Sequence, residues 1–535
     1  MGLFDKIRSK DAISIPKSEK SKPKKEKTVE IKSKPTSSFS KKYQNTNIES
    51  MIPNIIDKYS LKIDGVDFNI IIGKKDGVMH YEIPEVAQIT NTLSNLSEEH
   101  ILKMKSSISE GEFQKFSEIQ GYLSTYSEKN GLNLKNTEIQ NLAKYFYLII
   151  GKLGFLEIPL HDDQLEEIMI NGLNTPSFVF HRKYQMCKTN IVFNNEEELS
   201  RIIENIAMLA GRSINSRTPM LDAFLPDGSR VNATTRDVTL LGNTLTIRKF
   251  SSDPLTVIDL IKFGTFNPEL AAFLWQAVEG YFGAKPANTL IVGGTGSGKT
   301  TTLNVVSMFS MYTDRIITIE DTPELQIPHD HVIKMITRLP RPGIPEYEIT
   351  MNDLIKNALR MRPDRIFVGE VRGAEAQSLL VAMNTGHDGC SGTLHANSAD
   401  EAIIRLINPP MNVPKVMISS LDFIINQQRI KRNRKTIRRI LGIMEIGGSG
   451  EDISKTNLFK YDGTTDSIRK EGICMWEEHV CNIAGITRDE LIEDRINRME
   501  VIKYAVKNNI RDIKGVGDLI KRYQENPENV LRNIL

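Results

Sequence analysis

The sequence predicts an α/β fold in its C-terminal half, because short apolar runs alternate there with helical segments. The runs are residues 289–292, 315–319, 365–369 and 392–395. Thr350 and Ser398, which lie between or after these runs, are each followed three positions later by an acid, as at the start of a helix. Apolar strands that alternate with helices form a mainly parallel sheet with both faces covered.

Length and composition indicate a globular protein with several domains. The chain has 535 residues, of which 40% are hydrophobic and 25% are charged, so collagen-like, knottin and wholly disordered classes are excluded. A net charge of +2 gives no sign of a general nucleic-acid binder. The four cysteines include no Cys-x-x-Cys pair, which fits a reducing interior. No apolar run reaches the roughly 18–20 residues of a membrane span, and no signal peptide is recognisable, so we expect a cytoplasmic protein.

The chain is expected to begin with a basic tail at residues 1–45. Residues 1–43 contain 13 Lys/Arg and 5 Asp/Glu, a balance of +8, and their Lys, Ser and Pro content predicts disorder. The tail is either solvated or a peripheral contact to an anionic membrane or acidic partner. The regions expected after it are a mixed helical region at 46–154, a small α+β domain at 155–262 and the α/β domain at 263–535, with core motifs within 288–430.

A phosphate-binding loop is predicted at residues 293–300, which match the pattern G-x-x-x-x-G-K-[ST]. An apolar strand precedes the loop and a helical segment follows it, so backbone N–H groups and the helix N-terminus face the phosphates. Lys299 is expected to neutralise the phosphates of ATP, and the Thr300 hydroxyl to bind Mg²⁺. The predicted nucleotide-binding residues of this segment are Gly293, Gly294, Thr295, Gly296, Ser297, Gly298, Lys299, Thr300 and Thr301.

Hydrolysis also requires a group that orients the attacking water at the end of a neighbouring strand. Two acids qualify as catalytic residues: Glu324, the last of three carboxylates in segment 318–324, and Glu370, which ends an apolar run. Gly369 stands where many P-loop proteins have a metal-binding Asp. The metal is therefore expected to be held by Glu370 through water, by carboxylates of segment 318–324, or by both. His395, at the end of a third run, is expected to hydrogen-bond the γ-phosphate or its water.

Together these motifs resemble the secretion-superfamily ATPases, which drive type II and type IV secretion, type IV pili and archaeal flagella. The matching segments are Walker A at 293–300, the Asp box at 318–324, Walker B at 366–370 and the His box at 392–398. The resemblance covers roughly residues 155–430. The extended N-terminal region and segments 320–325 and 361–366 most resemble the archaeal branch, which includes the flagellar (archaellum) motor ATPases. The tetracysteine zinc element usual in bacterial type II ATPases is missing, and retraction and conjugation ATPases are usually shorter.

The resemblance implies a homohexamer in which a RecA-like C-terminal domain and the domain before it bind ATP between them. Closure around ATP would bring Arg217 and Arg230, as catalytic residues, and Arg248, as a nucleotide-binding residue, onto the phosphates. The ring would push on an integral membrane platform protein that assembles pilin-like subunits. The ATPase would then lie at the inner face of the cell membrane.

Two other functions stay open at this point. A nucleic-acid motor with the same core could use a basic segment after residue 430, although no aromatic residues interleave with it to stack on bases. The residues of this segment are Lys431, Arg432, Arg434, Lys435, Arg438 and Arg439. A structural adaptor that binds ATP without hydrolysing it is the second alternative, against which the intact Lys299, Glu324 and Glu370 argue. No nucleic-acid partner is expected.

Overall fold

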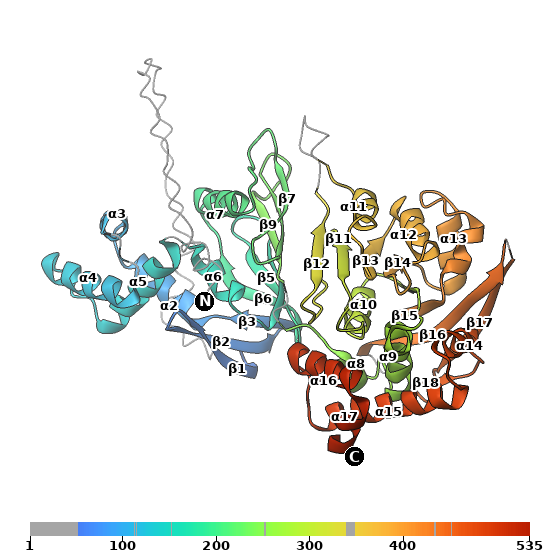
Figure 1. Ribbon diagram of the computed structural model, residues 1–535. Coiled ribbons are helices and arrows are strands. Elements are labelled where there is room, and N and C mark those ends of the chain that lie inside the picture. The colour runs from blue at the N-terminus through green and yellow to red at the C-terminus, as the bar shows by residue number, and fades with distance from the viewer. Residues whose placement is uncertain are drawn as a thin grey trace. The chain divides into compact units, whose positions relative to one another are not determined.

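The chain forms two compact units, one that ends at Ser251 and one that begins at Ser252 (Figure 1). The computed structural model describes residues 52–111, 113, 115–150, 152–250, 253–338, 348–432, 435–450 and 452–534. The basic tail predicted at residues 1–45 lies outside these described residues. Within them, no helix is long and apolar enough to cross a membrane.

The first unit is built on a nine-stranded sheet with the order β1-β2-β3-β6-β5-β4-β9-β8-β7. Its strands are β1 (Asn54–Ile63), β2 (Val66–Lys75), β3 (Val78–Glu82), β4 (Leu165–Ile170), β5 (Pro176–His181), β6 (Gln185–Val192), β7 (Met220–Phe224), β8 (Arg230–Thr234) and β9 (Thr244–Arg248). All neighbouring strands are antiparallel except β3 and β6, where Tyr81 pairs with Thr189 in parallel. The regions expected at 46–154 and 155–262 therefore share one sheet.

The helices of the first unit pack into the same core as its strands. They are α2 (Pro84–Ser94), α3 (Glu98–Glu110), α4 (Phe116–Lys129), α5 (Asn136–Ile149), α6 (Glu157–Leu160) and α7 (Glu196–Leu209). Phe68 and Ile70 alternate with exposed residues along β2 and are fully buried, as is Phe146 of α5. Asn195 starts α7, because its side chain accepts hydrogen bonds from the N–H groups of Glu197 and Glu198.

The second unit contains the predicted α/β sheet, with the order β12-β11-β13-β14-β10-β15-β16-β17-β18. Its strands are β10 (Thr289–Gly293), β11 (Ile316–Glu320), β12 (Val332–Ile336), β13 (Arg365–Val371), β14 (Ser391–His395), β15 (Phe423–Arg432), β16 (Lys435–Ser449), β17 (Asp452–Asp462) and β18 (Ser467–Lys470). The strands from β12 to β15 pair in parallel, and those from β15 to β18 pair antiparallel. The prediction of a mainly parallel α/β sheet is confirmed.

Helices cover both faces of this sheet, which explains the uninterrupted apolar runs in the sequence. The helices are α8 (Val257–Lys262), α9 (Pro268–Gly283), α10 (Lys299–Ser307), α11 (Met351–Ala358), α12 (Glu375–Asn384), α13 (Ala399–Ile407), α14 (Met475–Ala484), α15 (Arg488–Lys507), α16 (Ile513–Glu525) and α17 (Pro527–Ile534). Ile291 of β10 packs in the cluster that includes α9, α10 and α15, while its neighbours Leu290 and Val292 pack in the cluster that includes α11, α12 and α13. Strand β10 therefore buries both sets of its alternating side chains.

The predicted helix starts at Thr350 and Ser398 are confirmed, with one difference in detail. Thr350 accepts a hydrogen bond from the Asp353 N–H, and the Asp353 carboxylate accepts from the Thr350 N–H, so a complete capping box starts α11. Ser398 accepts from the Glu401 N–H at the start of α13. The Glu401 carboxylate instead accepts from the backbone and side-chain N–H groups of Asn397.

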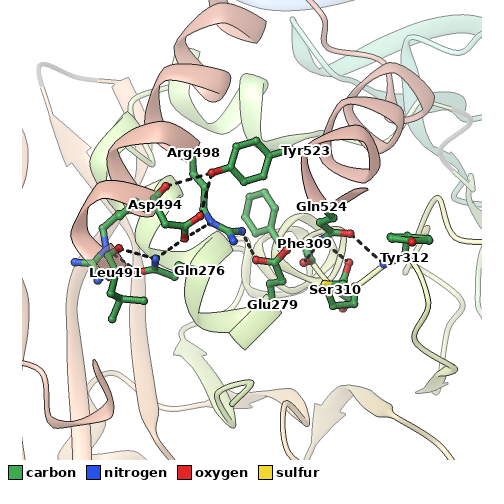
Figure 2. A network of polar contacts seen from close by, with 12 residues as sticks. Gln276, Glu279, Phe309, Ser310, Tyr312, Leu491, Asp494, Arg498, Tyr523 and Gln524 are labelled. Carbon is green, nitrogen blue, oxygen red and sulfur yellow. Dashed lines mark hydrogen bonds and ion pairs between the residues drawn. The ribbon is translucent and has the colours of Figure 1, made fainter. Parts of the chain in front are cut away.

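A buried polar network attaches the C-terminal helices to the core (Figure 2). Arg498 of α15 is fully buried and forms ion pairs with Glu279 of α9 and with Asp494. The Tyr523 hydroxyl of α16 donates to Asp494 at 3.0 Å. Next to it, the Gln524 amide donates to the carbonyl oxygen of Ser310, three residues after α10 ends. The helix that begins at the phosphate-binding loop is therefore held at its far end by the C-terminal helices.

Candidate nucleotide-hydrolysis site

The predicted phosphate-binding loop connects the end of β10 at Gly293 to the start of α10 at Lys299. Gly296 and Gly298 adopt left-handed φ angles of 69° and 94°, which other residues rarely tolerate. Gly293 is required for another reason, since an added Cβ there would lie 2.0 Å from the carbonyl oxygen of Gln427. The loop therefore turns tightly against strand β15.

Lys299 is the first residue of α10, and only 7% of its surface is exposed. Its Nζ donates a hydrogen bond to the Gly294 carbonyl oxygen at 3.2 Å, across the loop. Burial lowers the pKa of Lys299, and the nearby Glu370 carboxylate opposes that shift. Thr300 and Thr301 follow in the first helical turn and are half-buried. The ammonium group thus stays over the loop, where a phosphate would replace the carbonyl as its partner.

Glu370 and His395 come together at the carboxyl ends of two neighbouring strands. His395 ends β14 and stands in register with Gly293 of β10, while Glu370 lies near the end of β13 on the other side of β14. His395 Nε2 lies 3.1 Å from Glu370 Oε1. Burial and the Lys299 charge lower the pKa of His395, which favours its neutral form at pH 7. The structure therefore brings Lys299, Glu370 and His395 to one edge of the sheet, as expected.

Arg372 is a residue of this site that the sequence analysis missed. Its guanidinium forms an ion pair with Glu370 Oε2 and lies 3.6 Å from Asp321 Oδ2. Asp321 also accepts a hydrogen bond from the Thr337 hydroxyl at 2.9 Å. Two-thirds of the Arg372 side chain is exposed, so the guanidinium is held by charge and not by packing. The Arg372 guanidinium thus links the carboxylates of Glu370 and Asp321.

The Asp box is shaped by a buried carboxylate at the end of β11. Glu320 Oε1 accepts hydrogen bonds from the N–H groups of Glu324 and Leu325 at 2.9 and 3.0 Å. Burial raises the pKa of Glu320 to about 7, against the effect of those two N–H donors. An added Cβ at Gly369 would lie 3.1 Å from Glu320 Cγ, which gives a packing reason for glycine before Glu370. Glu324 is half-buried in this turn, and its catalytic role stays a prediction.

Gln427 of β15 holds the phosphate-binding loop in place and was also missed. Its side-chain amide donates to the Ser297 carbonyl oxygen at 2.9 Å, and its Oε1 accepts from the Thr302 hydroxyl at 2.5 Å. The residue is 1% exposed, so both contacts are shielded from water. A single buried amide thus bridges the loop and the helix that follows it.

The three predicted arginines lie in the first unit, and the structure brings only two of them together. Arg230 and Arg248 pair directly across β8 and β9, and both are exposed. Arg230 forms an ion pair with Asp222 of the adjacent strand β7 at 2.7 Å. Arg217 lies in the turn before β7, at the opposite end of the β7–β8 pair from Arg230. The approach of these arginines to a nucleotide stays a prediction.

A lysine held over a P-loop, with a carboxylate and a neutral histidine at adjacent strand ends, is the arrangement of a P-loop ATPase. Residues 153–533 match the family described as "Type II/IV secretion system protein". The chain belongs to this family, whose ATPases hydrolyse ATP and form hexamers. Its core is the α/β fold with a mostly parallel sheet that the resemblance implied.

Three comparisons show how far the similarity extends. "Uncharacterized protein MJ0781" of Methanocaldococcus jannaschii is 47% identical and is matched over 100% of this chain and 97% of its own length. "Putative conjugal transfer protein Rv3659c" of Mycobacterium tuberculosis is 35% identical over 51% of this chain and 77% of its own. The crystal structure of the VirB11 ATPase from the Brucella suis type IV secretion system is 25% identical over 54% of this chain and 92% of its own, with a TM-score of 0.28.

Proposed function

We propose that this chain is the hexameric ATPase motor of an archaeal flagellum (archaellum) or a type IV pilus-like filament, which it drives through a membrane platform protein. Membership in the secretion family supports the motor function. The archaeal assignment is supported by the relative from Methanocaldococcus jannaschii, which is similar over the whole chain. The resemblance of segments 320–325 and 361–366 to the archaeal branch also supports it. Attachment to the inner face of the membrane is part of the same proposal.

The observation that carries the chemistry is the meeting of Lys299, Glu370 and His395 at one sheet edge. The loop N–H groups and Lys299 bind and neutralise the phosphates of ATP. Glu370 orients the water that attacks the γ-phosphorus, because its Oε1 is buried and makes no hydrogen bond of good geometry with any described group. Neutral His395, 3.1 Å from the same oxygen, then hydrogen-bonds the γ-phosphate or the water. Glu324 is the second candidate for the water-orienting role.

The residues at this edge also fit a Mg²⁺ ion. The Thr300 hydroxyl makes no hydrogen bond within the described part of the chain, and Glu370 Oε1 is buried without one. Hydroxyl and carboxylate oxygens are the ligands that Mg²⁺ prefers. Thr300 would hold the metal directly, and Glu370 through water. When bound, the ion would neutralise negative charge on the transferring phosphoryl group.

Arg372 couples nucleotide binding to the state of Glu370. Its guanidinium pairs with Glu370 Oε2 and Asp321, on the opposite side of the carboxylate from Oε1. A bound triphosphate supplies a stronger anionic partner for an exposed guanidinium. We expect Arg230 and Arg248 of the first unit, and Arg217 with them, to reach the phosphates when the two units close. Hydrolysis removes the γ-phosphate, so the contacts between the arginines and that phosphate no longer favour the closed arrangement.

The test combines an assay of the purified chain with complementation in the organism that carries it. Glu370→Gln keeps the shape of the residue and removes its charge, so ATP should still bind while hydrolysis collapses. Glu478→Gln, an exposed acid on α14, is the matched control and should change neither. A deletion strain complemented with Glu370→Gln should lack surface filaments in electron micrographs, and the control should restore them. Normal filaments without the gene would contradict the filament proposal.

Conjugal transfer is the second candidate, because one relative is named as a putative conjugal transfer protein. A DNA-translocating ATPase would contact DNA phosphates through the basic segment of β15 and β16. Arg439 is unsuitable for this role, because it is 8% exposed and paired with Asp466 at 2.8 Å. Lys431 and Lys435 are exposed and could contact phosphates. Stimulation of ATP hydrolysis by single-stranded DNA, lost in Lys431→Gln, would favour this candidate over the filament motor.

A further inference from the structure

Two arginines face the phosphate-binding loop from the strands beside it. Arg429 of β15 and Arg438 of β16 pair directly across the two strands. Arg438 Nε donates a hydrogen bond to the Gly296 carbonyl oxygen at 3.0 Å. An added Cβ at Gly296 would lie 3.2 Å from Arg429 Nη1. Both guanidinium groups therefore lie at the exposed middle of the loop, in the same unit as Lys299.

Alternation along the strands explains why both arginines point the same way. Gln427, two residues before Arg429 on β15, contacts the loop at Ser297, so the side chain of Arg429 projects on the same face. Arg438 stands opposite Arg429 and shares that face. A bulge between Asn426 and Gln427 sets this register. The sheet face on which the buried Gln427 amide contacts the loop therefore also carries the guanidinium groups of Arg429 and Arg438.

No carboxylate among the described residues balances the charge of this pair. Like charges directly opposite each other on a sheet are destabilising. In the portions of the chain that the structure describes, neither Arg429 nor Arg438 pairs with a carboxylate. The adjacent Arg439 differs, since it points away from the loop and is neutralised by Asp466. An anion bound between these two exposed guanidinium groups, beside the phosphate-binding loop, would relieve their repulsion.

We infer that Arg429 and Arg438 are phosphate ligands of the nucleotide bound at this loop, an inference that rests on the proposed nucleotide site. Guanidinium groups bind phosphate oxygens through paired, charge-assisted hydrogen bonds. The bound phosphates balance the two facing charges, while Lys299 acts from the helix side. The arginines that contact nucleotide are therefore not confined to the first unit. The second unit carries its own pair, fixed by strand register.

Arg429→Gln and Arg438→Gln test this inference in the full-length protein. Fluorescent ADP is titrated against each variant, and each should bind it about tenfold more weakly, the loss of about one charge-assisted contact. Lys460→Gln on β17 removes the same charge from an exposed site in the same sheet and should bind as the wild type does. Thermal unfolding of nucleotide-free Arg429→Gln should match or exceed that of the wild type, because a like-charge repulsion is removed.

Competition with two simple probes identifies which part of the nucleotide is contacted. Inorganic pyrophosphate should compete less well against ADP in both variants, while adenosine should compete as it does in the wild type. A loss confined to adenosine would place the guanidinium groups against the base and overturn the inference. Unchanged ADP affinity in both variants, with Lys299→Ala defective, would overturn this inference alone. Unchanged affinity in Lys299→Ala as well would overturn the nucleotide site itself.

Discussion

The two nine-stranded sheets of this molecule position functional groups in different ways. In the second unit, parallel strands bring their carboxyl ends to one edge, where Lys299, Glu370 and His395 meet although about a hundred residues separate the first from the last in sequence. In the first unit, antiparallel strands place Arg230 and Arg248 side by side on a strand pair through cross-strand register. An edge of parallel strands gathers side chains from several motifs, whereas a cross-strand pair places two side chains of one kind next to each other.

The largest expected effect is the loss of hydrolysis when Lys299 is removed from the parallel edge. Lys299→Ala should lower the ATPase rate by about 10²–10³-fold or more, because a preorganised charge on the transferring phosphoryl group is lost. The release of phosphate by the purified chain measures this. Lys460→Ala should retain the wild-type rate, and both proteins should give the same circular dichroism spectrum. Turnover at the wild-type rate in Lys299→Ala would remove the P-loop from the mechanism.

The next prediction asks whether the first unit contributes to catalysis. We expect Arg230→Ala to reduce the rate by about 10³-fold, the scale of an arginine that stabilises the transition state. A fragment that begins at Ser252, where the second compact unit starts, should show a similar loss while it still binds ATP weakly. Arg236→Ala, an exposed arginine of the same unit paired with Glu196, is the control. A fully active fragment would show that the second unit alone completes the site.

The strand pattern of the parallel sheet could be predicted from the sequence because its strands are buried on both faces. The apolar runs at 289–292, 365–369 and 392–395 correspond to β10, β13 and β14, and the glycine pattern identified the phosphate-binding loop. The shared edge of Lys299, Glu370 and His395 followed from strand alternation. These features depend on residues close in sequence, or on the rule that the carboxyl ends of parallel strands lie at one edge of the sheet. A single sequence therefore contains enough information to predict them.

Features that depend on pairing between distant strands could not be predicted. Gln427 contacts the loop only because β15 lies beside β10, and a bulge before it fixes where Arg429 points. Arg372 stands two residues after Glu370. Residues two apart at a strand end lie on the same face, and this spacing is the one signal that could have indicated the Arg372–Glu370 contact. The parallel pairing of β3 with β6 joins segments about a hundred residues apart, and no local pattern marks it.

Loss of a buried ion pair in the second unit should cost more unfolding free energy than loss of an exposed ion pair in the first unit. Arg498→Met in the second unit leaves Glu279 and Asp494 buried without their cation and should cost about 3–5 kcal/mol. Arg236→Met breaks an exposed ion pair of the first unit and should cost at most about 1 kcal/mol. Both tryptophans of the chain, Trp275 and Trp476, lie in the second unit, so tryptophan fluorescence during urea unfolding reports that unit. Far-UV circular dichroism follows the unfolding of Arg236→Met, whose unit contains no tryptophan. A fluorescence midpoint of Arg498→Met equal to that of the wild type would contradict the assigned role of the buried network.

The smallest expected effect is a difference in how the two units respond to pH. Burial raises the pKa of Glu320 in the second unit to about 7, whereas burial lowers the pKa of Lys249 in the first unit to about 8. A carboxyl whose pKa is raised by folding stabilises the folded state at low pH and loses that contribution as pH rises toward 7. A lysine whose pKa is lowered binds its proton more weakly in the folded state, so its contribution becomes more favourable as pH rises from about 8 toward 10.5.

Glu320→Gln isolates the contribution of the second unit, because the amide oxygen can still accept the N–H groups of Glu324 and Leu325. We expect the difference in unfolding free energy between variant and wild type to change by about 1–3 kcal/mol between pH 4.5 and pH 7.5. The variant should gain on the wild type as pH rises, since only the wild type must ionise a buried carboxyl. Urea unfolding monitored by tryptophan fluorescence measures this difference at each pH. Parallel curves for the two proteins would mean that Glu320 titrates alike in the folded and unfolded chain, and the turn of the Asp box would then be held by an ionised carboxylate at pH 7.5.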